Sequence, residues 1–286
     1  MNAATRITAA SLVVIAMVLA APAELVAQSG SSRQQVVKAG PATLHVTITG
    51  RGEPIVFIPS RGRGVEDFED LSTRLVQAGY QAILPEPRGI GGSTGPLDGI
   101  TYHDLASDVA AVIQSVARGP ATVVAHAFGT RVARTLAADH PGRVKQLILL
   151  AAAGAVPRSA ATEATTTRFW ETPLPPGDRL AAIRQLFFAA GNDPRVWADG
   201  WHFDVARAQR ASDAKTPLRD WWTGGSAPML VLQGTDDVIV LPENAKRLAA
   251  EFADRVTVVQ IAHAGHALLP EQPDAIAKAV LTFLRR

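Results

Sequence analysis

Short apolar runs alternate with amphipathic segments along most of the chain. Between Thr43 and Thr49 apolar and polar side chains alternate, which predicts a half-buried strand, and between Val65 and Ala78 apolar residues recur at helical spacing. Further strands are predicted at 35–38, 55–59, 82–84, 144–150, 229–232 and 256–261, and further helices at 105–116, 243–252 and 276–284. Such alternation predicts an α/β fold with a doubly wound, mostly parallel sheet.

The pattern changes between residues 155 and 225, where the strand-like runs stop. All five tryptophans of the chain lie in this segment. We therefore predict a helical cap at 155–225, inserted into an α/β core formed by 28–154 and 226–286. One insertion within a continuing alternation favours a single sheet with a lid over two independent domains. The cap aromatics either line an apolar pocket or form the core of the cap itself.

The first 27 residues carry the pattern of an export signal. Arg6 precedes an apolar stretch at 7–20, and small residues follow as far as Ala23. The pattern predicts a signal peptide at 1–27, cleaved after Ala23 or Ala27, and therefore a periplasmic or secreted protein without a stable membrane span. An uncleaved anchor is the alternative, although the stretch is short for a bilayer span.

Composition narrows the classes of partner. The chain has 28 basic and 26 acidic residues, a formal charge of +2, and no basic run that would follow a phosphate backbone, which argues against nucleic acid binding. The absence of cysteine excludes disulfides, a thiol nucleophile and cysteine-ligated metals. The pair His263 and His266 lacks a helix to align it for a metal, and the glycine loop at 89–91 carries Thr94 where a dinucleotide motif needs glycine. We predict no cofactor and no metal, and expect a small-molecule substrate or ligand.

A tight turn at residues 125–129 is the most informative motif. The segment Ala-His-Ala-Phe-Gly follows a β-branched run and precedes a helix. The same strand-turn-helix geometry is written G-x-S-x-G in enzymes that raise a nucleophilic serine above a sheet. Here the serine position is Ala127, so a serine acyl-enzyme cannot form at that residue.

Residues 53–284 resemble the α/β-hydrolase fold superfamily, in the lidded subgroup of esterases, haloalkane dehalogenases, epoxide hydrolases and hydroxynitrile lyases. The resemblance rests on the order and spacing of segments that are weak individually: 88–93, 125–129, 234–237, 265–266 and 271–273. The fold uses the chain order serine, acid, histidine, and these three positions fall on Ala127, Asp237 and His266.

The resemblance implies a role for each of these positions. His266 would be the general base, and Asp237 would orient it and stabilise its charged form. Asp236 is the alternative acid. A solvated loop histidine and a pair of turn acids are the structural alternatives. His126, inside the turn, is expected to pack beneath it.

The resemblance also places an oxyanion hole at two backbone amides, those of Phe128 and Arg61. In relatives the preceding strand usually ends in His-Gly, whereas here it ends in Pro59-Ser60. Relatives with lyase activity carry a hydroxyl residue at this position. Ser60 is therefore either a source of polar chemistry or a strand-end serine bonded to backbone.

Three accounts of Ala127 compete: an artificial knock-out, an enzyme that works without a nucleophile, and a protein that only binds a small ligand. Ala125 and Pro59-Ser60 also depart from the family pattern, which favours natural divergence over a single introduced change. Because the acid and base positions remain filled, we favour an enzyme that works by base catalysis. We expect it to be exported and to act on a small, largely apolar carbonyl or ester-type substrate. The alternatives are a non-catalytic ligand-binding protein and lyase-type or Ser60-dependent chemistry.

Overall fold

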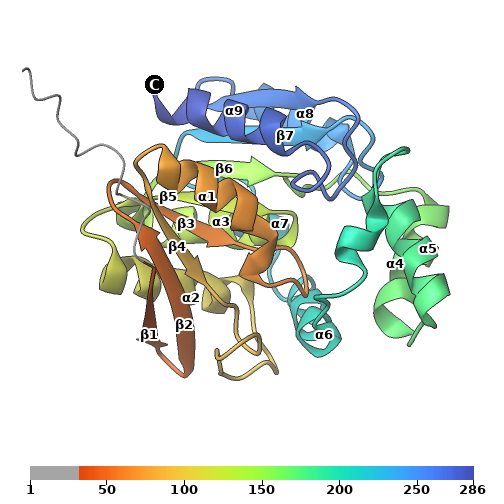
Figure 1. The fold of residues 1–286 in the computed structure, drawn as a ribbon, viewed down its shortest axis with the longest axis horizontal. Helices are drawn as coiled ribbons and strands as arrows, with labels where there is room; N and C mark the ends of the chain where they lie inside the picture. The colour runs from red at the N-terminus through yellow and green to blue at the C-terminus, as the bar shows by residue number, and fades with distance from the viewer. Residues whose placement is uncertain (1–31) are drawn as a thin grey trace, which may run out of the picture.

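An eight-stranded sheet forms the centre of the molecule (Figure 1). The computed structural model describes residues 32–286, so the predicted signal peptide at 1–27 lies outside the described residues. The strands are β1 Arg33–Ala39, β2 Ala42–Gly50, β3 Pro54–Ile58, β4 Gln81–Pro85, β5 Ala121–His126, β6 Val144–Leu150, β7 Met229–Gly234 and β8 Val256–Ile261. Their spatial order is β1-β2-β4-β3-β5-β6-β7-β8. Only the β1–β2 and β2–β4 pairs are antiparallel, which confirms the predicted mostly parallel sheet.

Helices cover both faces of this sheet. The helices of the described chain are α1 Glu69–Gln77, α2 Tyr102–Val116, α3 Phe128–Asp139, α4 Ala160–Glu171, α5 Pro176–Phe187, α6 Phe203–Ser212, α7 Leu218–Trp221, α8 Pro242–Glu251 and α9 Pro273–Leu284. The apolar faces of α2, α3 and α8 contribute to one core cluster, and those of α1 and α9 to another. This division between two faces is what makes the fold doubly wound.

The helices α4, α5 and α6 lie between β6 and β7 in the chain and group to one side of the sheet in Figure 1. They have a hydrophobic cluster of their own, which includes Phe169, Trp170, Phe187 and Trp197. Trp221 and Trp222 instead belong to the core cluster of the sheet, because α7 packs against α3. Within residues 32–286, no helix is both long and apolar enough to cross a bilayer.

The turn from β5 into α3 brings the helix close to the neighbouring strand. Gly129, the second residue of α3, faces the end of β3, and a Cβ atom there would lie 2.5 Å from the Ile58 carbonyl oxygen and 2.6 Å from that of Pro59. Real Cβ atoms do not approach backbone oxygen so closely, so α3 takes this position only because residue 129 has no side chain.

We therefore expect Gly129→Ala to lower the free energy of unfolding by about 1–3 kcal/mol, since either the helix or the strand must shift to admit the methyl group. Chemical denaturation measures the loss. Gly142→Ala is the matched control, because a Cβ atom at Gly142 meets nothing within 4 Å. Equal stability of the two variants would contradict this account of the turn.

Candidate active site

The structure brings His266 and Asp237 together. Asp237 follows β7 and His266 lies in the loop after β8, and His266 Nδ1 is 2.9 Å from Asp237 Oδ2. The two side chains are 5% and 0% exposed. Since a carboxylate only accepts hydrogen bonds, Nδ1 donates, and Nε2 is left with the lone pair that a general base needs.

Both oxygens of Asp237 are occupied, which fixes the carboxylate. Its Oδ1 accepts from the backbone N–H groups of Ile239 and Val240, each at 2.8 Å. The alternative acid, Asp236, is exposed and accepts instead from the hydroxyl of Thr235. The structure therefore places Asp237, and not Asp236, beside the imidazole.

A buried carboxylate that sequence reasoning gave no role, Glu271, holds the loop of His266. Its two oxygens accept from the amides of Gly265 and Leu268, on either side of the histidine, at 2.9–3.0 Å. Glu271 Oε1 also accepts from the Ala189 amide at 2.7 Å and from Asn192 Nδ2 at 2.8 Å. The available signal was the polar Glu271-Gln272 pair just before a helix that begins with proline, a pattern that does not specify partners distant in sequence.

The turn at Ala127 keeps the strained backbone of a nucleophile elbow. Ala127 is buried and has φ 49° and ψ −107°, a conformation that costs a non-glycine residue about 1–3 kcal/mol. Its N–H donates to the Leu150 carbonyl at 2.9 Å, and its carbonyl accepts from the N–H of Thr130 at 3.0 Å and from its hydroxyl at 2.6 Å. These bonds hold the turn although no nucleophile is presented there.

His126 lies beneath this turn and contacts the base loop. Its Nε2 is 2.8 Å from the carbonyl oxygen of His266. Burial, reinforced by the nearby His266, lowers the pKa of His126 to about 3. The ring is therefore neutral at neutral pH, and its Nε2–H donates to the carbonyl. This bond links the turn to the loop that carries His266.

The two amides predicted to form an oxyanion hole are free to bind a ligand. Among the described residues, neither the Arg61 nor the Phe128 N–H donates to a backbone or side-chain acceptor. The Ser60 side chain is buried, and its hydroxyl makes no hydrogen bond to any residue in the range 32–286. A serine with only a structural role at the end of a strand is expected to bond to the backbone, and the Ser60 hydroxyl does not.

These groups share one cavity of about 60 Å³, more than the roughly 10–15 Å³ that a single water molecule needs. Ser60, Ala127 and His266 line it together with Arg61 and Phe128. Much of the remaining wall is aromatic and aliphatic, supplied by Trp170, Phe187, Trp197, Trp201, Ile239 and Val240. Some of the cap aromatics therefore do line a pocket, in addition to packing with one another.

Sequence reasoning missed two further residues of the cavity wall, Arg131 and Arg158. Arg131 lies four residues after Ala127, one turn into the helix, so helical spacing could have placed it beside the site. Arg158 precedes α4 and has no such signal. As for metals, the part of the chain that the structure describes contains no group of three or more histidine and acidic side chains able to hold an ion.

Comparison with known proteins agrees with this architecture. The family model for the alpha/beta hydrolase fold matches residues 53–273. BpoC of Mycobacterium tuberculosis, which carries the name of a non-heme bromoperoxidase, is 28% identical over 252 residues, covering 82% of this chain and 94% of its own. Its crystal structure superposes with a TM-score of 0.72 over 85% of this chain and 95% of that chain, at 27% identity.

A second relative, 2-(acetamidomethylene)succinate hydrolase of Mesorhizobium japonicum, is 26% identical over 270 residues, covering 87% of this chain and 94% of its own. An esterase from Exiguobacterium antarcticum has the same fold, with a TM-score of 0.76 at 20% identity over 89% of this chain and all of that chain. With the sheet order, the elbow and the acid–base pair in place, the match over residues 53–273 shows that the chain belongs to the alpha/beta hydrolase fold family.

Proposed function

We propose that the protein is a hydrolase that attacks a small carbonyl compound directly with water, using His266 as general base and forming no acyl-enzyme. The observation that carries the proposal is the space at Ala127. It has room for water and is lined by His266 and by the two residues whose amides are free, Arg61 and Phe128. Membership of a hydrolase-type family supports the same class of reaction.

In the proposed mechanism, His266 Nε2 takes a proton from a water molecule as the water oxygen forms a bond to the substrate carbonyl carbon. The carbonyl π electrons move to the oxygen, which the amides of Arg61 and Phe128 stabilise as an oxyanion. The Asp237 carboxylate stabilises the imidazolium that results. When the tetrahedral adduct collapses, the leaving group departs and takes the proton from Nε2. Water is consumed, and the acid and the protonated leaving group are released.

Such a mechanism tolerates the loss of the serine. Removing the nucleophile from an enzyme built around an acyl-enzyme costs roughly a millionfold, yet about 10³–10⁴ of rate enhancement over water remains from binding and oxyanion stabilisation. Base assistance adds about 10²–10⁴ when the base is within reach of the attacking water. A substrate with a reactive carbonyl needs no more than these contributions.

We also propose that the protein is exported, on the basis of the sequence of residues 1–27. Expression of the full chain in a bacterial host should give a periplasmic or secreted product whose N-terminus is Glu24 or Gln28. N-terminal sequencing of the fractionated protein measures this. A product that stays in the membrane fraction with Met1 intact would instead indicate an uncleaved anchor.

We expect His266→Ala and Asp237→Asn each to lower kcat/KM by about 10²–10⁴, because the first removes the base and the second removes the charge that orients it. Turnover of a panel of small esters, lactones and cyanohydrins measures the effect. Asp236→Asn is the matched control and should leave turnover unchanged, since the Asp236 carboxylate is exposed and accepts, among the described residues, only from the Thr235 hydroxyl. Unchanged turnover in the first two variants would rule out the mechanism. Thermal stabilisation by a ligand that yields no product would identify a binding protein.

We expect Ala127→Ser to create a reactive hydroxyl, because the elbow backbone and the acid–base pair are already in place. A serine-directed phosphonate should form an adduct at position 127 in this variant, detected by mass spectrometry. The unsubstituted protein is the control and should form none while it still turns over substrate. An adduct on Ser60 in the unsubstituted protein would show that Ser60 is a nucleophile and contradict the direct attack of water.

A further inference from the structure

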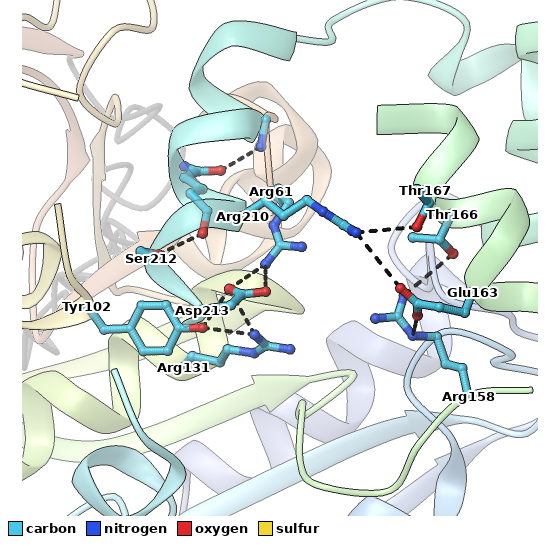
Figure 2. Close-up of polar contacts among 12 residues, drawn as sticks. Arg61, Tyr102, Arg131, Arg158, Glu163, Thr166, Thr167, Arg210, Ser212 and Asp213 are labelled. Carbon is cyan, nitrogen blue, oxygen red and sulfur yellow. Dashed lines mark hydrogen bonds and ion pairs between the residues drawn. The ribbon is translucent and has the colours of Figure 1, made fainter. Parts of the chain in front are cut away.

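The cavity wall has a strong charge asymmetry. Arg61, Arg131 and Arg158 line the cavity, and no aspartate or glutamate does. Their side chains are only 12%, 19% and 23% exposed. Figure 2 shows the guanidinium groups of Arg131 and Arg158 extending into the same space from opposite sides. A wall of this kind favours a ligand that carries negative charge.

A single carboxylate serves two of these arginines. Asp213, at the end of α6, accepts from the Arg61 guanidinium with both oxygens at 2.7 Å. The same carboxylate lies 3.0 Å from Arg131 and accepts from the Tyr102 hydroxyl at 2.6 Å. Burial opposes the charge of Asp213, but the two guanidinium groups outweigh it and hold its pKa below the usual value. Asp213 is therefore ionised, and this partly buried group of two arginines and one carboxylate keeps a surplus of one positive charge.

The third arginine has a weaker partner. Arg158 Nε is 3.3 Å from Glu163, whose side chain is half exposed and is shared with Arg210 at 3.9 Å. Burial is the main cause that lowers the pKa of Arg158, and repulsion from Arg131 and Arg210 lowers it further. The attraction of Glu163 acts in the opposite direction and offsets only part of this effect. An anion between Arg131 and Arg158 would relieve this repulsion and regain part of the lost solvation.

Two further features define the ligand. The cavity lies at the N-terminus of α3, where the helix dipole also favours an anion. Many of the other lining side chains are apolar, such as Trp170, Phe187 and Ile239, which favours a ligand with an organic remainder. A cavity of about 60 Å³ limits it to a few heavy atoms unless the cap moves.

We propose that this cavity binds a small organic carboxylate, with its carboxylate group held between Arg131 and Arg158 and its reacting carbonyl turned toward His266. The placement of the carbonyl rests on the proposed function, whereas the binding of the carboxylate does not. The substrate class is thus a small carboxylic acid anion, in place of the largely apolar compound expected from the sequence.

The test is equilibrium binding of unreactive probes to the full chain at pH 7 and low salt, measured by calorimetry. The probes are propanoate and butanoate, each compared with the neutral ketone of the same shape, butan-2-one and pentan-2-one. We expect each acid to bind about tenfold or more tightly than its matched ketone, as charge-assisted hydrogen bonds to guanidinium predict. Arg158→Gln should abolish this preference, and Arg158→Lys should retain part of it.

Arg210→Gln is the matched control. Arg210 contacts Glu163 and Glu171 and does not line the cavity, so the preference for acids should survive. Equal binding of acids and ketones, no binding of either acid, or equal losses in Arg158→Gln and Arg210→Gln would overturn the proposal. Because the probes have no bond to hydrolyse, His266→Ala should still bind them. If the protein prefers the acids but shows no turnover, the proposed function fails and this inference stands. If it shows turnover but no preference for the acids, this inference fails and the proposed function stands.

Discussion

The tight packing of α3 against β3 determines the geometry of the site. The helix can approach the strand this closely because Gly129 has no side chain. The chain makes a sharp turn at Ala127, just before the helix begins. That turn directs the Phe128 amide and the helix dipole into the cavity, and it sets Arg131 one turn further along the same face. The backbone amide and the helix dipole therefore favour negative charge in the cavity whatever side chain stands at position 127.

Asp213 joins parts of the molecule that are far apart in sequence. It lies at the end of α6, and its partners come from the loop after β3, from α2 and from α3. Removing this carboxylate would leave two buried guanidinium groups unpaired, a state far more costly than the pair itself is stabilising. The group thus fixes the cap to the core and sets the charge of the cavity at the same time.

The sequence predicted the fold well because periodicity and turn residues act locally. The strands predicted at 43–49 and 144–150 fall where the pattern indicates. The acid–base pair was predicted from chain order, and the two side chains do meet. The arginine pocket was not predicted, because Arg61, Arg131 and Arg158 are separated by long stretches of chain and no short spacing records that they converge. The role of Glu271 was missed for the same reason, since half of its partners belong to the cap.

The position of Glu271 has a consequence for how a ligand can enter. One carboxylate bonds both the loop of His266 and the cap segment at Ala189 and Asn192. Displacing that end of the cap would break the bonds to Ala189 and Asn192 and leave the Glu271 carboxylate bonded only to the loop of the base. Among the described residues, α4 makes no bond to Glu271, so a displacement of the cap at α4 would leave this support of the base in place.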